Sequence, residues 1–548
     1  MPSDVRMRGS LKGGDSPSWR GVGVTRARSW WPVAGAVAMA SIAGTLTVVS
    51  PRTGLVSAAA LSVVVFAAYY RQRLPRMFLV LVGISLFGYT FLGKGYAYFG
   101  VSPIFIGELL LLFGVLAALL GGGFMPALRS PISWLVILWG VWGLVCTVPY
   151  LGVYGLDALR DATIWGYGAF AILVAGFMLR LRWWTKASDA YARWFWWFAF
   201  WSPIAGVIFT TVEPSIPRVP GSDIPLLFVK AGDFGVQLAG AATFVLVGLA
   251  DARWQRSPHR VALEWLWWMA WLAGVAITGA ASRGALVSVV IAVATVILLH
   301  RRAQFWKPAL VSFVFAFVFV SADLKLHAGQ EREVSARQIA ENLRSIWGGQ
   351  TNTSNLEGTR AWRLQWWQDI IDYTVHGRYF WMGKGFGVNL ADDDDYQGTV
   401  NGLPNRSPHN IQMTVLARAG VPGLVVWSLL QSAFALSLVV AYFRARRERR
   451  DWWARVNLWI FSFWLAFMVN AAFDVFIEGP QGGVWFWCLI GFGIAALEAQ
   501  RAERSESRQP ARAQARGHVT HRVPAPPMPQ PALPVAGGPN VNRPRGFP

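Results

Sequence analysis

Residues 284–300 have the sequence GALVSVVIAVATVILLH, a continuous apolar run without Asp, Glu, Lys or Arg. A membrane hydrocarbon core about 30 Å thick is crossed by a helix of roughly 17–25 such residues. The run therefore predicts a membrane-spanning helix. Similar runs precede and follow it, separated by polar loops.

The sequence contains about 14 runs of this kind, which together predict an all-α, polytopic integral membrane protein. The runs at 235–250, 308–322 and 483–498 are short, so we expect about 12–14 transmembrane helices. An even number places both termini on one side of the membrane. The predicted spans are residues 30–49, 54–70, 77–93, 104–120, 131–148, 163–179, 194–211, 235–250, 265–282, 284–300, 308–322, 421–443, 458–476 and 483–498.

The composition of the 548-residue chain excludes a soluble globular protein, because 54% of its residues are hydrophobic and 14% are charged. A net charge of +21 would suggest nucleic-acid binding in a soluble protein, but Lys and Arg lie here in loops between apolar runs. We therefore expect membrane lipids, and no nucleic acid, as partners. Cys146 and Cys488 lie inside predicted spans, which excludes a disulfide framework or a structural zinc site.

Every second loop is basic, as the positive-inside rule predicts for cytoplasmic loops. The clearest example is RARRERR at 444–450, whereas the intervening loops carry acidic residues. The long extracytoplasmic segment contains LQWWQDIIDY at 364–373, which has the apolar spacing of a helix, and loops of such length are usually functional. The predicted segments are a cytoplasmic tail at 1–29, transmembrane helices at 30–322, a functional extracytoplasmic loop at 323–420, further helices at 421–498 and a disordered, Pro- and Arg-rich cytoplasmic tail at 499–548.

Two arginine clusters lie in the expected extracytoplasmic region. In TGAASRGALVSVV, Arg283 separates two apolar runs, where a charge is costly unless it is paired or lies at the interface. The alternative is an interfacial anchor that extends toward water. In GTRAWRLQWWQDII, Arg360 and Arg363 lie beside Trp366 and Trp367. One guanidinium group can donate two parallel hydrogen bonds to two oxygens of the same phosphate. An amphipathic helix that lies on the bilayer would explain the same pattern.

The segment GKGFGVN begins at Gly383, and Gly383 and Gly385 permit a backbone that approaches a ligand closely. A glycine run alone is weak evidence, and GKGFG lacks the GK[ST] of a nucleotide-binding loop. His409, followed by Asn410, lies at the start of a predicted helix, where an anion or a neutral imidazole is favoured. The alternative for His409 is a polar helix cap.

Carboxylates are the third group of candidates. The run Asp392–Asp395 could bind a divalent cation, but four like charges in sequence more often form a solvated loop, so we predict no metal site. Other carboxylates in the expected extracytoplasmic loops are candidate bases, and their spacing selects none of them: Asp157, Asp161, Glu213 and Asp223.

Together these clusters resemble the O-antigen ligases and the related O-antigen or exopolysaccharide polymerases of bacterial envelopes. The family pattern is an SRG motif at the start of a span, a long loop with a WRLxxW-like stretch and GxGxG, and then HNxxLxxLxxxGxxG. Met413 stands where the family often has Leu. The matching residues are Ser282-Arg283-Gly284, Trp362-Arg363-Leu364 with Trp367, Gly383 to Gly387, and His409-Asn410 with Leu416, Gly420 and Gly423.

The resemblance implies an inverting, metal-independent glycosyltransferase that needs no cofactor and acts at the outer face of the bacterial plasma membrane. Its donor would be a glycan on undecaprenyl pyrophosphate, and its acceptor a hydroxyl of a glycan or glycolipid. Arg283 and Arg363 would stabilise the charge that develops on the leaving pyrophosphate. His409 would take the proton of the acceptor hydroxyl or bind the pyrophosphate. The implied substrate-binding residues are Arg360, Trp366, Trp367, Gly383, Gly385 and Asn410.

Two other functions fit the composition. A transporter for lipid-linked glycans would place charges and broken helices near the bilayer midplane, where the predicted spans are almost free of charge. A glycosyltransferase that uses a polyprenyl-phosphate sugar and an outer-loop Asp base would depend on Asp157 or Asp161. The motifs do not separate a ligase from a polymerase, because the two differ only in acceptor. Other polysaccharide-assembly proteins are possible partners.

Overall fold

The computed structural model describes residues 70–101, 104–250, 258–300, 306–321, 326–327, 333–334, 354–397, 399–400 and 403–520. The predicted N-terminal tail, the span at 30–49 and nearly all of the span at 54–70 lie outside the described residues. The chain divides into two compact units, and the described part of the first is residues 70–77 and 116–122. The second unit contains all the candidate site residues.

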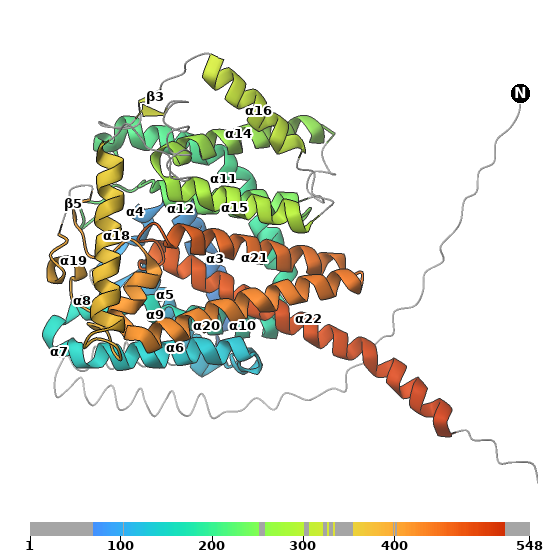
Figure 1. The fold of residues 1–548 in the computed structure, drawn as a ribbon. Coiled ribbons are helices and arrows are strands. Elements are labelled where there is room, and N and C mark those ends of the chain that lie inside the picture. The colour runs from blue at the N-terminus through green and yellow to red at the C-terminus, as the bar shows by residue number, and fades with distance from the viewer. Residues whose placement is uncertain are drawn as a thin grey trace, which may run out of the picture. The chain divides into compact units, whose positions relative to one another are not determined.

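The described part of the chain is almost entirely helical (Figure 1). Every predicted span from residue 77 onward falls on one helix, except 163–179, which falls on α9 and α10. The helices are α3 Leu74–Leu92, α4 Lys94–Ala97, α5 Ile106–Gly121, α6 Pro131–Thr147, α7 Leu151–Tyr154, α8 Leu156–Asp161, α9 Thr163–Gly166, α10 Gly168–Leu181, α11 Trp184–Val212, α12 Ala231–Leu246, α14 Arg260–Ala281, α15 Arg283–Leu299, α16 Trp306–Ser321, α18 Ser354–Val375, α19 Leu390–Asp393, α20 Ile411–Arg447, α21 Asp451–Ala471 and α22 Pro480–Thr520.

Among the described residues, 7 helices are long and apolar enough to cross a membrane. The count rises to 8 if the bent pair Leu156–Gly166 and Gly168–Leu181 is one span, and α5, α12 and α15 are shorter apolar helices. The prediction of an all-α, polytopic membrane protein is therefore confirmed. Short antiparallel strand pairs occur in the connections, formed by β1 Gly100–Val101 with β2 Ile104–Phe105, β3 Leu326–His327 with β4 Glu333–Val334, and β5 Thr399–Val400 with β6 Leu403–Pro404.

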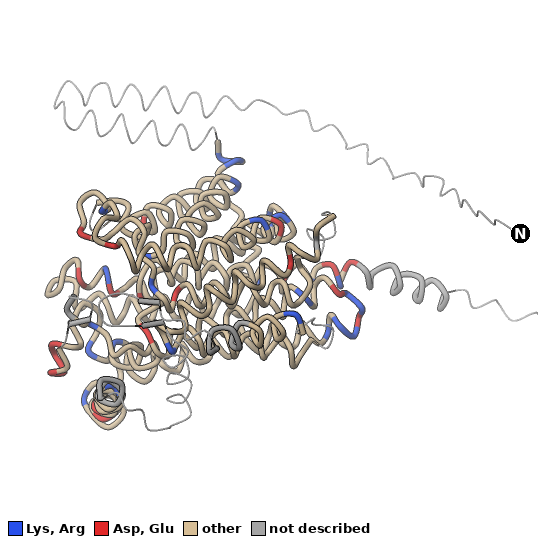
Figure 2. The backbone as a smooth tube through the Cα atoms, turned by 90° about the horizontal axis from the view of Figure 1, so that it is seen from above, with Lys and Arg blue, Asp and Glu red and all other residues tan. Residues whose placement is uncertain are grey.

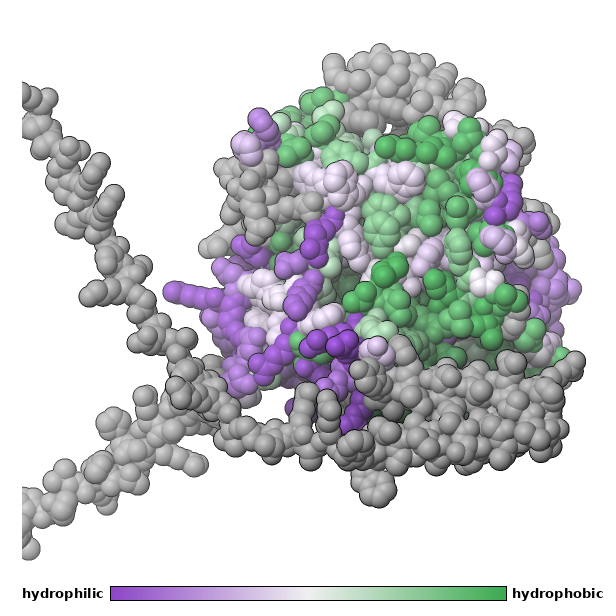
Figure 3. Space-filling model, turned by 180° about the vertical axis from the view of Figure 1, so that it is seen from behind, coloured by the Kyte–Doolittle hydropathy of each residue, from purple (hydrophilic) through white to green (hydrophobic). Residues whose placement is uncertain are grey.

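Helix α22 is the most enclosed of the candidate spans, with 94% of its most apolar window buried. It packs on α10, where a Cβ at Gly491 would lie 2.7 Å from the carbonyl oxygen of Ala171. Small residues allow this close approach of two helix backbones, as is common in membranes. In contrast, Trp134, Val290 and Leu436 are exposed on α6, α15 and α20, and broad hydrophobic areas cover the surface in Figure 3. These exposed faces suit contact with lipid.

Helix α18 runs across the ends of α20 and α21 instead of parallel to them (Figure 1). Its Trp366 and Ile370 are fully buried against Leu390 of α19 and Leu416 of α20. This cluster explains why LQWWQDIIDY forms a helix, as its spacing predicts, even though the segment is not apolar enough to span a membrane. The cluster fixes α18 over one end of the layer that α20, α21 and the neighbouring membrane-spanning helices form, called the helix layer below.

A break at Gly420 divides α20 into a short first part and a long apolar second part. Gly420 has φ 67° and ψ −172°, outside the helical region, and Pro422 lies two residues further along the chain. The predicted span begins at 421, so the structure confirms its start and adds a preceding helical segment that begins at Ile411. A positive φ favours glycine, which explains the residue at this point.

Helix α22 continues to Thr520, well past the predicted end of the last span at residue 498. The prediction of a disordered tail is therefore wrong for residues 499–520, while residues 521–548 lie outside the described part. Ala, Arg, Gln and Glu dominate this extension, and all four are good helix formers. Charged residues gather mainly toward the two ends of the helices, whereas the middle of the layer has few of them (Figure 2).

We predict that Gly420→Ala lowers the stability of the protein by about 1–3 kcal/mol. Its methyl group would contact the carbonyl oxygen of Phe380 and lie 2.7 Å from the carbonyl carbon of Trp381, and its φ would be strained. Thermal unfolding in detergent measures the change. Gly140→Ala in α6 is the matched control, because no atom lies within 4 Å of the added Cβ. Equal stability of the two variants would contradict a strained break at Gly420.

Candidate active site

The first turns of α12 and α15 and the end of α21 meet at one end of the helix layer. A Cβ at Gly235 of α12 would lie 2.6 Å from the Ala285 Cβ of α15. Gly232 and Gly284 both approach the side chain of Asn470 on α21, with Cβ positions 2.9 Å and 3.1 Å from its Oδ1. Two helix N-termini, which are positively polarised, therefore lie side by side at this place.

Local capping explains where α15 and α20 begin. The Ser282 hydroxyl accepts a hydrogen bond from the Ala285 N–H at 3.3 Å, so the serine of the SRG motif is the N-cap of α15. The Asn410 Oδ1 accepts from the N–H groups of Gln412 and Met413 at 2.9 Å and 3.2 Å. Asn410, and not His409, therefore caps α20, which makes the cap interpretation of His409 wrong.

Arg363 reaches from α18 to the segment that follows α21. Its Nη1 donates to the carbonyl oxygen of Phe473 at 2.9 Å. Burial lowers the pKa of Arg363, the nearby Asp474 carboxylate raises it, and the positive charge of Arg283 lowers it further. The structure therefore brings the predicted arginines Arg283 and Arg363 within electrostatic range of each other, although 80 residues separate them in the sequence.

His409 lies beside a carboxylate that is already paired with a lysine. The Asp474 Oδ1 is 3.8 Å from the His409 Nδ1, and the Asp474 Oδ2 is 2.9 Å from the Lys230 Nζ. Burial by itself would raise the pKa of Asp474, but the charge and hydrogen bond of Lys230, together with His409, hold it well below its usual value. His409 is buried and has φ 54°, a conformation that costs a non-glycine residue energy and is concentrated at functional sites.

Lys94 and Lys230 belong to the same cluster, and sequence analysis missed both. Two backbone hydrogen bonds join the end of α3 to the segment before α12. The Lys94 N–H donates to the carbonyl oxygen of Phe228, and the Phe228 N–H donates to the carbonyl oxygen of Leu92, each at 3.1 Å. Burial and then the charge of Lys230 lower the pKa of Lys94, while Asp233 and Asp474 raise it. The available sequence signal was that each lysine stands at one end of an apolar run, as Arg283 does.

A second carboxylate, Glu478, holds the loop that carries His409. The hydroxyls of Ser407 and Thr414 each donate to its Oε1 at 2.9 Å, and the Thr163 hydroxyl donates to its backbone oxygen at 3.0 Å. Burial raises the pKa of Glu478 to about 7, although Arg418 and the two hydroxyl bonds oppose this shift. The residues on both sides of His409 are therefore tied to the segment before α22.

The glycine segment after α18 is held by a buried ion-pair network. Arg418 of α20 is 3.0 Å from Asp161 through its Nη2, and its Nη1 donates to the carbonyl oxygen of Val388 at 3.1 Å. The same Asp161 Oδ2 lies 3.3 Å from Arg406 and accepts from the Gly387 N–H at 3.2 Å. Asp161 is thus occupied as a structural anion, which argues against its role as a catalytic base.

Two predicted substrate-binding residues, Trp366 and Trp367, are hydrogen-bonded within the protein. Trp366 is fully buried and donates to Asp394 at 2.7 Å, so it cannot lie against a polyprenyl chain or a sugar. Trp367 donates to the carbonyl oxygen of Pro408 at 2.9 Å and thereby supports the residue next to His409. The side chain of Arg360 lies outside the described residues.

Gly383 and Gly385 lie against other parts of the protein. A Cβ at Gly383 would lie 2.5 Å from the carbonyl oxygen of Ala417, and one at Gly385 would collide with the Tyr150 ring. Both have positive φ values. Their close approach is therefore to α20 and to the segment before α7, not to a ligand.

The acidic run at 392–395, which begins inside α19, has a lysine as its partner. The Lys384 Nζ lies 2.5 Å from Asp393 and also binds Asp394, which in turn accepts from Tyr373 at 3.2 Å. The interpretation of the run as a solvated loop does not hold for Asp394, because its side chain is buried. Within the described ranges, no group of three or more His, Cys, Asp or Glu residues is placed to hold a metal ion.

The segment that contains the arginines and the histidine can be compared with known proteins. Residues 268–428 match the family described as O-antigen ligase. This match confirms the resemblance drawn from the motifs, and it supports a glycan-handling role of the O-antigen ligase or polymerase type in a multi-pass membrane protein. Comparison with curated proteins gives no match.

The O-antigen ligase match includes Arg283, Arg363 and His409, which the structure brings to one end of the layer. Three of their charged neighbours lie outside the matched residues: Lys94, Lys230 and Asp474. The site is therefore completed by parts of the chain that precede and follow the family segment.

We predict that Asp161→Asn lowers stability by about 3–5 kcal/mol, because it leaves Arg418 buried without its counter-ion. Thermal unfolding in detergent is the measurement. Asp157→Asn is the matched control, since Asp157 is half exposed and its partners Arg160 and Arg406 are 3.2 Å and 3.8 Å away. Loss of activity in Asp161→Asn with unchanged stability would instead indicate a catalytic base.

A pH-dependent contribution to stability is expected from Glu478. Because the folded chain binds this proton more tightly than the unfolded chain, the contribution is full below about pH 4.5 and is lost as the pH rises through about 7. Glu478→Gln should therefore raise the unfolding temperature above pH 7 relative to the wild type, and flatten its dependence on pH between 4.5 and 7. Glu213→Gln, an exposed carboxylate paired with Arg218, is the control. An unchanged pH profile in Glu478→Gln would refute the assignment.

Proposed function

We propose that this protein transfers a glycan from undecaprenyl pyrophosphate to a sugar hydroxyl, with inversion, at the outer face of the bacterial plasma membrane. The observation that carries the proposal is the approach of Arg283, Arg363 and His409 to one another at the end of the helix layer. These three residues come from separate motifs of the O-antigen ligase segment, and the same place holds Lys230 and Asp474.

The charges of this cluster suit a pyrophosphate leaving group. Arg283 and Arg363 supply guanidinium groups, and Lys230 and Lys94 supply ammonium groups around the same Asp474 carboxylate that influences Arg363. The first turns of α12 and α15 add backbone N–H groups and the positive ends of two helices. Groups fixed in place before the reaction stabilise the charge that grows on the leaving phosphate more than they stabilise the ground state.

His409 is the residue best placed to take the acceptor proton. Asp474 faces its Nδ1, so the Nε2 is the nitrogen assigned to the acceptor hydroxyl, and the Asp474 carboxylate would stabilise the imidazolium that forms. The acceptor oxygen bonds to the anomeric carbon from the side opposite the pyrophosphate. The carbon–oxygen bond to the pyrophosphate breaks, its electron pair remains on the phosphate oxygen, and the hydroxyl proton passes to His409.

The proposed outer-face location follows from the direction of α20. The helix begins at Ile411, beside His409, and ends at Arg447 in the basic run 444–450. Basic runs of this kind favour the cytoplasmic side, which puts the other end of α20 outside. Both termini would then be cytoplasmic, and the activated donor would supply the energy without ATP or a metal.

An alternative is a transporter for lipid-linked glycans. The clustered charges at the end of the layer favour the transferase, because transport sites are usually near the bilayer midplane. The alternative in which an outer-loop Asp is the base is disfavoured by the pairing of Asp161 with Arg418. The acceptor decides between ligase and polymerase, and the experiment below separates them.

We expect the purified protein to elongate or transfer an undecaprenyl-pyrophosphate-linked repeat unit in the presence of a chelator. His409→Gln should lower the rate by about 10²–10⁴-fold, because the acceptor proton loses its base. Arg363→Ala should abolish detectable transfer, since it removes a donor to the leaving group. Mass spectrometry of the lipid-linked products measures both effects.

Arg218→Ala is the matched control, because Arg218 is exposed and paired with Glu213 away from these residues. Growth by whole repeats would establish a polymerase, and transfer only to an added second acceptor would establish a ligase. Loss of the wild-type reaction in the chelator would overturn metal independence. Absence of transfer to every acceptor, together with passage of the donor across vesicle membranes, would establish the transporter.

A further inference from the structure

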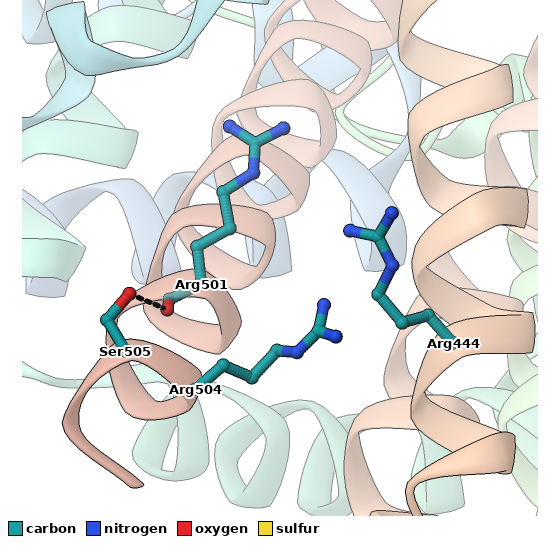
Figure 4. Close-up of a pocket in the computed structure, with 4 residues that line it drawn as sticks. All are labelled: Arg444, Arg501, Arg504 and Ser505. Carbon is teal, nitrogen blue, oxygen red and sulfur yellow. Dashed lines mark hydrogen bonds between the residues drawn. The ribbon is translucent and has the colours of Figure 1, made fainter. Parts of the chain in front are cut away.

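The end of the helix layer opposite His409 contains a pocket that the proposed reaction does not use. It has a volume of about 620 Å³ and is lined by Arg444, Arg501, Arg504 and Ser505. Arg444 comes from the last turn of α20, and the other three come from α22 (Figure 4). The Arg444 side chain faces the two α22 arginines across the space between the helices.

Ion pairs hold the two helices in position around this pocket. Arg504 binds Glu448, and Arg450 binds Glu503, whose carboxylate also accepts from the Trp453 indole at 2.8 Å. These contacts connect α22 to the turn between α20 and α21. The pocket therefore has preformed walls, and its arginines do not have to be gathered when a ligand binds.

The charge of the pocket is only partly compensated. Arg501 lies 2.5 Å from Glu498 and Arg504 is paired with Glu448, whereas the Arg444 guanidinium has no carboxylate partner among the described residues. Residues 444–450 and 498–504 together contain 7 arginines and 3 glutamates. Converging guanidinium groups with excess positive charge match the oxygens of a phosphate diester.

Apolar surface leads directly to the pocket along α20. Leu436, Val440 and Arg444 are spaced four residues apart and so lie on one face of the helix. Leu436 and Val440 are exposed, and so is Phe443 next to Arg444. The acyl chain of a phospholipid would lie along this face while its headgroup reaches the arginines. A free phosphate in water would contact the arginines but not the apolar face.

We propose that this pocket binds the headgroup of an anionic phospholipid. The phosphate oxygens contact Arg444 and Arg501, the Ser505 hydroxyl lies at the rim, and an acyl chain follows Leu436 and Val440. Inorganic phosphate shares the headgroup chemistry but lacks the chain. The proposal does not depend on the glycosyl transfer, because the pocket lies at the other end of α20 and its test measures binding.

The test uses the full chain in a nonionic detergent, titrated with phosphatidylglycerol, phosphatidylcholine or inorganic phosphate. Native mass spectrometry counts retained lipids, and thermal unfolding reports stabilisation. We expect a retained phosphatidylglycerol that raises the unfolding temperature, and no comparable effect of phosphatidylcholine. Arg444→Gln should weaken phosphatidylglycerol binding by about tenfold, the loss expected for a charged hydrogen bond.

Arg447→Gln is the matched control, because Arg447 belongs to the same basic run and does not line the pocket. Arg501→Gln is a second pocket variant, and it should reproduce the effect of Arg444→Gln. Equal loss of lipid in Arg447→Gln would show diffuse attraction to the basic run and would overturn the pocket. Stabilisation by inorganic phosphate without retention of phosphatidylglycerol would show a soluble anion as the ligand and would also overturn the proposal.

Discussion

The candidate site depends on how the Asp474 carboxylate compensates a group of positive charges. Lys230 and Arg363 approach it, Lys94 and Arg283 are close enough to influence the same groups, and the His409 imidazole lies on its other oxygen. Without this anion, the cations would repel one another at the ends of helices that are themselves positively polarised. With it, part of this repulsion is offset and the group still keeps an excess of positive charge. A dianionic ligand would find the excess already in place, so little rearrangement would be required on binding.

Hydropathy predicted most of the fold, because a chain in a membrane must satisfy its backbone hydrogen bonds within helices. Every predicted span from 77 onward is helical, although 163–179 is divided between α9 and α10, and the spacing of LQWWQDIIDY correctly predicted α18. The motifs also named Arg283, Arg363 and His409, which the structure brings together. Helix capping by Asn410 was missed, although an Asn before an apolar run is a strong N-cap signal. The extension of α22 past 498 was not predicted, because this segment shares Arg and Ala with the Pro-rich tail that follows, although these residues are also good helix formers.

The remaining errors concern residues whose roles depend on distant partners. Trp366 and Trp367 are adjacent and identical in type, yet their partners differ. Trp366 is fully buried and donates a hydrogen bond to Asp394, whereas Trp367 donates to the carbonyl oxygen of Pro408. The glycines Gly383 and Gly385 suggested a ligand, but the backbone they approach belongs to α20 and the segment before α7. The sequence left Asp161 as a candidate base, whereas the structure pairs its carboxylate with Arg418, which lies far along the chain. Local spacing does not contain such contacts, and Lys94 and Lys230 carry no motif at all.

The enclosed position of α22 has a consequence for how the protein is made. The helix that fills the middle of the second unit begins at Pro480, so it leaves the ribosome after the other spans that the structure describes. Until then α10, synthesised about 300 residues earlier, lacks the neighbour against which Ala171 packs. Assembly within the bilayer must therefore wait until α22 has been synthesised, and the earlier helices must remain inserted without this central neighbour. A chain terminated before residue 480 would lack this centre and would be exposed to membrane quality-control proteases.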